Sequence, residues 1–369
     1  MPLRISCAAS AKTTGTDVEF ERSEAPYTGP RTSVDTVMLQ VLLALVPAGV
    51  AHVWFFGPGL IFNTLVAVLF CTGSEALIVR LRGQDPRHAL GDYTAVVTAV
   101  LLALCLPSLT PWWVTATGSM FAIVVAKHLY GGVGFNMFNP AMAGYVAILI
   151  SFPGEMAFWL APKMGDIDYT HPSVLQTAWF TLSGGLPAAL EYDALARATP
   201  LDLMKTGLAN MQTAAEIRAE PLMGDFGGRG WEWIGNFFAI GGGWLLLRRV
   251  IRWQIPLGVG IGLLVPATVM YLVDAGSNAS PGFHLFSGAT LLCAFFIATD
   301  PVSAATSTAG RLVYGVGIGL LIYAIRSWGA YADGVAFAVL FMNMLVPLID
   351  RYTRPHIVGH NQSRTGGDT

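Results

Sequence analysis

The chain has 369 residues and a net charge of −2, and 54% of its residues are hydrophobic whereas only 12% are charged. Because a soluble domain normally carries about 25% charged residues, this composition excludes an ordinary soluble protein and predicts an integral membrane protein. The small net charge gives no reason to expect a nucleic-acid partner.

Ten apolar stretches follow one another, and each is a candidate for a spanning helix, which needs about 17–25 residues. Five precede a long polar segment and five follow it, so we predict an all-α integral membrane protein with about ten transmembrane helices and a possible five-plus-five internal repeat. The predicted divisions are a cytoplasmic N-terminal segment (1–33), a first transmembrane half (34–153), an external loop (154–230), a second transmembrane half (231–350) and a cytoplasmic tail (351–369). The stretches are 36–56, 58–79, 93–106, 112–129, 140–152, 231–247, 254–273, 284–299, 312–325 and 335–349.

Basic residues in the short loops orient these helices, because cytoplasmic loops are enriched in Lys and Arg. Ten of the eleven basic residues counted follow even-numbered stretches, and only Arg326 follows an odd one. We therefore predict that both termini are cytoplasmic and that the loop 154–230 is external. The ten are Arg80, Arg82, Arg87, Lys127, Arg248, Arg249, Arg252, Arg311, Arg351 and Arg354.

The external loop contains Ala198-Thr199-Pro200-Leu201-Asp202, which has the pattern of a helix start. A Thr at the N-cap, a Pro at the first helical position and an acidic residue at the third are each favourable there. From the residues alone, Thr199 is therefore a helix cap.

Four motifs together resemble one family: Gly91-Asp92-Tyr93, and the segments 109–113, 131–142 and 298–304. The chain resembles the D subunit of the Rnf ferredoxin:NAD⁺ oxidoreductase complex and is similar to the B-type subunit of the sodium-pumping NADH:quinone reductase, over roughly 36–349. The resemblance implies a bacterial inner-membrane subunit, inactive alone, that relays electrons in a complex coupled to Na⁺ or H⁺ transport. The implied partners are A-, B-, C-, E- and G-type subunits and the lipid bilayer.

The resemblance also implies FMN joined through its phosphate to a Thr hydroxyl by a flavin transferase. The transferase recognises an Asp, five further residues ending in Ala, and then the Thr, and Asp193, Ala198 and Thr199 fit this spacing. The sequence departs from the family at Arg197, where Gly is usual, and one residue earlier, where Ala replaces Ser or Thr. Arg197 and Lys205 are expected to offset the phosphate charge.

A second threonine competes with this assignment. Ser287-Gly288-Ala289-Thr290 matches the compact Ser-Gly-Ala-Thr form better, but His284 rather than Asp lies six residues before Thr290. The predicted topology places Thr290 about 9 Å into a spanning helix, where a soluble transferase could hardly reach it. Small residues at this depth are expected to serve helix packing.

The run 131–142 predicts a non-helical break at membrane depth, whose backbone must be buried or line a cavity. The resemblance implies a non-covalent riboflavin near here in some relatives, with Asn136 and Asn139 as contacts and Asp300 as a further possible one. A purely structural break is an equally good interpretation.

A possible internal duplication depends on one pair of similar motifs, 138–143 and 299–304. Each contains an Asn or Asp followed by Pro, and each is expected to open the next helix. Two ordinary helix starts would explain the same pattern.

Glu75 is an ionisable residue within a predicted span, where a charge costs about 2.5–3.5 kcal/mol. It either snorkels to the inner interface or is a proton or cation ligand, and Lys127 and His128 are expected at that interface. The four cysteines form no CxxC pair, so no metal site is expected.

The sequence thus predicts the D-type membrane subunit of an Rnf complex that carries covalent FMN. One alternative is the B-type subunit of a sodium-pumping quinone reductase, and another, of a different class, is a flavin-free solute channel.

Overall fold

The computed structural model describes residues 33–164, 171–187 and 190–353. The chain divides into two units, 1–33 and 34–369, and only the second is described further. Residues 1–32 of the predicted N-terminal segment and residues 354–369 of the predicted tail lie outside the described residues.

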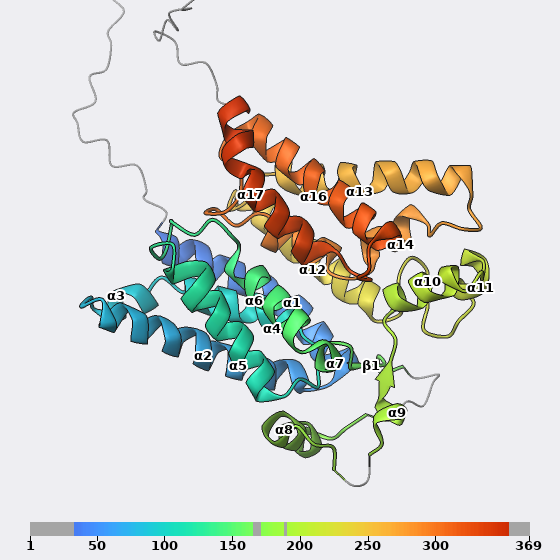
Figure 1. The fold of residues 1–369 in the computed structure, drawn as a ribbon, viewed down its shortest axis with the longest axis horizontal. Coiled ribbons are helices and arrows are strands. Elements are labelled where there is room, and N and C mark those ends of the chain that lie inside the picture. Colours follow the sequence, from blue (N-terminus) through green and yellow to red (C-terminus); the bar gives the residue numbers. More distant parts are fainter. Residues whose placement is uncertain (1–32, 165–170, 188–189, 354–369) are drawn as a thin grey trace, which may run out of the picture. The chain divides into compact units, whose positions relative to one another are not determined.

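The first half of the second unit consists of helices and the loops between them (Figure 1). Its third segment is short and follows the small helix α3, whose cap is Asp85 with Pro86 at the first position. Its fourth segment changes from α-helix to π-helix before it ends at His128. The elements are α1 (Val34–Phe56), α2 (Gly59–Leu81), α3 (Pro86–Leu90), α4 (Thr94–Leu104), α5 (Trp112–Met120), η1 (Phe121–His128) and α6 (Pro140–Ser151).

The second half repeats this order of long and short elements. Its short third segment, α15 with η2, again follows a small helix, α14. The π-helical stretch of this half lies in the third segment, whereas that of the first half lies in the fourth. The elements are α12 (Trp231–Leu247), α13 (Gln254–Val273), α14 (Pro281–Phe286), α15 (Thr290–Leu292), η2 (Cys293–Ile297), α16 (Thr308–Trp328) and α17 (Val335–Thr353). Counterparts also touch, since α1 packs on α12 and α6 on α17, which is consistent with a five-plus-five repeat.

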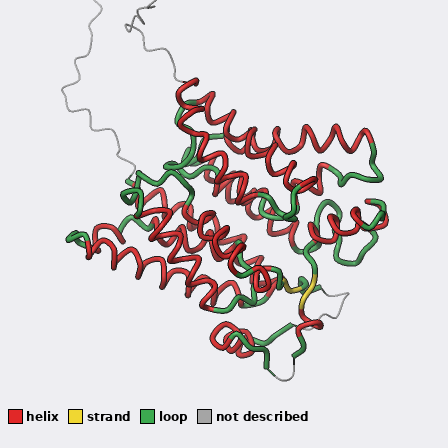
Figure 2. The backbone as a smooth tube through the Cα atoms, in the orientation of Figure 1, coloured by secondary structure: helices red, strands yellow, loops and turns green. Residues whose placement is uncertain are grey.

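The connecting segment between the halves consists of short elements. Two strands of two residues each, β1 and β2, form a small antiparallel sheet in this segment. Figure 2 shows these strands in yellow and the helices in red. The elements are α7 (Pro153–Met156), β1 (Trp159–Leu160), α8 (Val174–Ser183), α9 (Tyr192–Leu195), β2 (Ala196–Arg197), α10 (Pro200–Ala209) and α11 (Ala214–Arg218).

The prediction of an all-α integral membrane protein is confirmed. In the described part, five helices are long and apolar enough to cross a membrane: α1, α2, α13, α16 and α17. Every one of the ten predicted stretches contains helix. The predicted span 284–299 is wrong as one helix, because the chain leaves helical geometry at Ser287 and Gly288 has a φ of +63°.

The motif pair used to suggest duplication does not occupy equivalent positions. Pro140 does open α6, with Asn139 as its cap. Pro301, however, lies in a turn, and the next helix, α16, begins only at Thr308 with Ser307 as its cap. The expectation that both motifs start helices is therefore wrong for 299–304, because Ser307 supplies the capping hydroxyl seven residues after Asp300.

Helices α13 and α16 pack with their backbones in contact. A Cβ at Gly262 would overlap the carbonyl oxygen of Val316, and one at Gly319 would overlap that of Val259. Small residues permit this approach, and van der Waals packing of this kind supports helix association in lipid, where no hydrophobic force acts between helices.

Candidate functional site

A cavity of about 560 Å³ lies where the two halves and the connecting segment meet. Its wall includes α6, α12 and the start of α17, together with β1, the start of α10 and the turn at Gly288. Most lining side chains are apolar, and the volume is typical of a small-molecule or cofactor site. Thr199 and Asp202 lie on this wall.

Thr199 is the N-cap of α10, as the helix-start pattern predicts. Its Oγ1 donates to Asp202 Oδ2 at 2.5 Å and accepts from the Asp202 backbone N–H at 3.2 Å. Pro200 is the first helical residue. The side chain of Thr199 is only partly buried, so this cap is also a hydroxyl on the wall of a cavity.

The β-sheet fixes the position of the loop that carries Thr199. Trp159 of β1 pairs with Arg197 of β2, two residues before Thr199. The Trp159 ring packs edge-on against Trp231 of α12, with centroids 5.1 Å apart. Pro200 lies directly against Gly228, where a Cβ would overlap its ring. The loop that carries Thr199 is thus held against the second half.

The other residues predicted to act with Thr199 have separate surroundings. Ala198 is exposed, and the guanidinium of Arg197 donates to the Ala196 carbonyl at 2.8 Å. Asp193 belongs to α9, but its side chain lies outside the described part. The Lys205 ammonium donates to the carbonyls of Gly329 and Tyr331, at 2.5 and 2.8 Å, and so ties α10 to the loop between α16 and α17.

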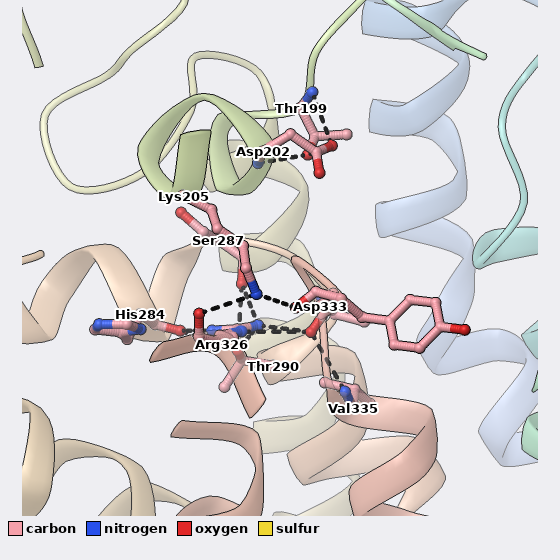
Figure 3. A network of polar contacts seen from close by, with 11 residues as sticks. Thr199, Asp202, Lys205, His284, Ser287, Thr290, Arg326, Asp333 and Val335 are labelled. Atoms are coloured by element: carbon pink, nitrogen blue, oxygen red, sulfur yellow. Dashed lines mark hydrogen bonds and ion pairs between the residues drawn. The ribbon is translucent and has the colours of Figure 1, made fainter. Parts of the chain in front are cut away.

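A partly buried ion pair, which the sequence did not reveal, lies beneath Thr199 (Figure 3). Arg326 Nη2 and Asp333 Oδ1 are 3.0 Å apart. Arg326 also donates to the carbonyls of His284 and Ser287, at 2.6 and 3.0 Å. Asp333 Oδ2 accepts from the Ala289 N–H at 2.9 Å. The pair therefore holds the turn between α14 and α15 in place.

Thr290 is the first residue of α15, so its predicted depth within a continuous spanning helix is wrong. The turn at Gly288 breaks that helix just before it. The Thr290 side chain is fully buried, donates to the His284 carbonyl at 3.0 Å and accepts from Arg326 at 2.8 Å. Its hydroxyl is thus enclosed by protein, in contrast to that of Thr199.

A second polar cluster lies where the loop before α6 meets the end of η2. Asn139 accepts from the Met142 N–H as a cap, and its side chain donates to the Ile297 carbonyl at 3.2 Å. The Asn139 N–H donates to Asn343 Oδ1 at 3.1 Å. These bonds join the two halves and occupy the side chain of Asn139.

The two other residues predicted near this break make local contacts. Asn136 donates to the Phe138 carbonyl at 3.0 Å, and Asp300 accepts from Ser303 Oγ at 2.7 Å. Neither contact brings the Asn136 and Asp300 side chains together. The segment from Gly131 to Met137 exposes several apolar side chains, among them Phe135 at 74%.

Glu75 does not snorkel. Its side chain is buried, and Oε1 accepts from Lys127 Nζ at 2.6 Å, with His128 Nε2 at 3.6 Å. Lys127 also donates to Thr94 Oγ1 at 2.7 Å. Lys127 and His128 lie in the last turn of η1, and both are buried against Glu75.

Comparison with known proteins gives consistent matches over nearly the whole chain. The family model described as the NQR2, RnfD, RnfE family matches residues 21–359. A protein from Aeromonas hydrophila, named as the D subunit of an ion-translocating oxidoreductase complex, is 48% identical over 345 residues, which is 92% of this chain and 99% of that protein. Proteins of the same name from Vibrio cholerae and Escherichia fergusonii are 47% and 44% identical, covering 92% and 93% of this chain and 99% of each relative.

Proposed function

The chain belongs to the NQR2, RnfD, RnfE family, and we propose that it is the D-type membrane subunit of an Rnf-type ferredoxin:NAD⁺ oxidoreductase and carries FMN on Thr199. Its relatives are named as subunits of an ion-translocating oxidoreductase complex. In this proposal the chain relays electrons in that complex, coupled to Na⁺ or H⁺ transport. Its partners are the A-, B-, C-, E- and G-type subunits, and a flavin transferase matures it.

The observation that carries the FMN proposal is the position of the Thr199 hydroxyl, partly exposed on the wall of the cavity at the start of a ten-residue helix. A phosphoester there would place its negative charge at the N-terminus of α10, where free N–H groups and the helix dipole favour anions. The hydroxyl of Thr290 has no comparable access.

The residues around the cavity suit a flat aromatic group with polar edges. Trp159 and Trp231 offer an aromatic wall, and α6 and α12 offer apolar side chains that exclude water. FMN would supply the electron-transfer chemistry, whereas the protein positions the ring and tunes its potential. Asp202 would lose the Thr199 hydroxyl as a donor and would keep the backbone N–H of Thr199.

Peptide mass spectrometry of the protein purified from membranes tests this proposal. The peptide that contains Thr199 should carry the added mass of FMN less one water, as a phosphoester requires. The peptide that contains Thr290 should be unmodified. An unmodified Thr199 with flavin on Thr290 would contradict the site and the external position proposed for the connecting segment.

We propose the following topology from the basic residues of the short loops: both termini in the cytoplasm, and the segment from Pro153 to Gly230, with Thr199, on the periplasmic side of the inner membrane. A cytoplasmic reporter fused after Thr369 should be active, and an alkaline phosphatase fusion there should be inactive. Phosphatase activity would require an odd number of spanning helices.

A second flavin, riboflavin held without a covalent bond, is proposed beside the loop before α6. Because Asn139 is already bonded to Ile297 and Met142, Asn136 and the exposed apolar residues of the loop would make most contacts. Acid extraction of the purified complex should release riboflavin, and Asn136→Ala should lower its yield several-fold, since a lost hydrogen bond costs about 0.5–1.5 kcal/mol. An unchanged yield would assign that flavin to another chain of the complex.

Co-purification separates this function from that of the B-type subunit of a sodium-pumping quinone reductase, the other function in the family. Ferredoxin-dependent activity in the purified complex would support the Rnf assignment. Quinone reduction would instead support the assignment to the quinone reductase. The lack of any flavin on the chain would favour the alternative function, that of a flavin-free solute channel.

A further inference from the structure

His52 of α1 lines the same cavity as Thr199. Its side chain is only 2% exposed, and neither ring nitrogen has a hydrogen-bond partner among the described residues. No other lining residue of the described part has a buried side-chain nitrogen or oxygen without a partner. A buried imidazole in this state is unfavourable unless a molecule in the cavity completes its hydrogen bonds.

A row of aromatic rings connects His52 with the Thr199 loop. The His52 ring lies 5.2 Å from that of Phe56, which lies 4.4 Å from Trp231. Trp231 in turn lies 5.1 Å from Trp159, the residue that pairs with β2 just before Thr199. The unpartnered imidazole and the proposed attachment point thus line one cavity and are joined by packed rings.

The two carboxylates of the wall already accept hydrogen bonds. Asp202 accepts from Thr199, and both carboxylate oxygens of Asp333 are bonded, one to Arg326 and the other to the Ala289 N–H. A neutral imidazole has one donor and one acceptor nitrogen. The pyrimidine edge of a flavin alternates acceptors with a donor, so it can complete such a ring.

We propose that His52 donates a hydrogen bond to the ring of the FMN carried by Thr199 and raises its reduction potential. This inference rests on the proposed function of Thr199. Reduction adds electron density to the acceptor atoms of the flavin ring. A fixed N–H donor therefore binds the reduced form more strongly than the oxidised form, because hydrogen bonds to charged groups are stronger.

The test is a redox titration of the purified complex, in which the spectrum of the Thr199→Val complex is subtracted to isolate the flavin on Thr199. His52→Leu should shift the reduction equilibrium of this flavin about tenfold or more toward the oxidised form, as loss of a hydrogen bond to a charged group implies. His52→Phe, which keeps an aromatic ring against Phe56 and Trp231, should give the same shift. His52→Gln, which keeps a donor, should restore most of it.

His284→Leu is the matched control, because it removes another buried imidazole whose ring packs on Tyr323 and does not line the cavity. It should leave the potential unchanged. If Thr199 carries flavin in the His52→Phe complex and the potential equals that of the wild type, His52 is only a packing residue and the inference is wrong, while the proposed function stands. If the wild-type Thr199 peptide carries no flavin, the proposed function fails and the inference fails with it.

Discussion

Thr199→Val should abolish the flavin fluorescence of the denatured chain in a gel, and Thr290→Val should leave it intact. A phosphoester requires a hydroxyl, and Val has nearly the shape of Thr without one. The Thr199 hydroxyl is partly exposed at the start of α10, whereas that of Thr290 is buried among the His284 carbonyl and Arg326. The expected change is the complete loss of the covalent flavin signal at equal protein loading.

Thr213→Val controls for the loss of the helix cap. Thr213 forms the same kind of capping box with Glu216 at the start of α11 that Thr199 forms with Asp202. Either substitution should cost about 0.5–2 kcal/mol of stability as a lost cap. Fluorescence lost in both variants would mean that folding of the connecting segment, rather than the attachment site, is being measured. Fluorescence retained in Thr199→Val would contradict the site directly.

The local features of the fold could be predicted from the sequence because they depend on neighbouring residues. Apolar length identified all ten helical stretches, and the pattern of Thr199, Pro200 and Asp202 identified the start of α10. The break at Gly288 could not be identified in this way. A three-residue turn within an apolar run looks continuous to a hydropathy window, although Gly at that position permits the left-handed backbone observed.

Contacts between residues that are far apart in the chain could not be predicted from the sequence. Glu75 and Lys127 are 52 residues apart, and Asn139 reaches Ile297 across 158. No helical periodicity connects such positions. One signal was available for Arg326. It was the lone basic residue in the short loops on its side of the predicted topology, and such a residue near a span requires a partner. That partner is Asp333, only seven residues later.

Removing one member of the buried pair between Glu75 and Lys127 should strongly destabilise the protein. Glu75→Leu or Lys127→Met leaves the other charge buried without its partner, which typically costs about 3–5 kcal/mol. The measurement is the free energy of unfolding in mixed detergent micelles. Arg87→Met, which removes an exposed cation, is the matched control and should change stability by no more than about 0.5 kcal/mol.

The double variant, Glu75→Leu with Lys127→Met, should be more stable than either single variant, because replacing a whole buried pair by apolar residues is often neutral. This sign follows from the geometry: Lys127 Nζ lies 2.6 Å from Glu75 Oε1, and both side chains are nearly inaccessible to solvent. A double variant whose cost equals the sum of the two single costs would show that the residues act independently. A water-filled path that reaches both residues would produce that result, because water would solvate each charge separately. Glu75 would then be part of a proton or cation route rather than half of a structural pair.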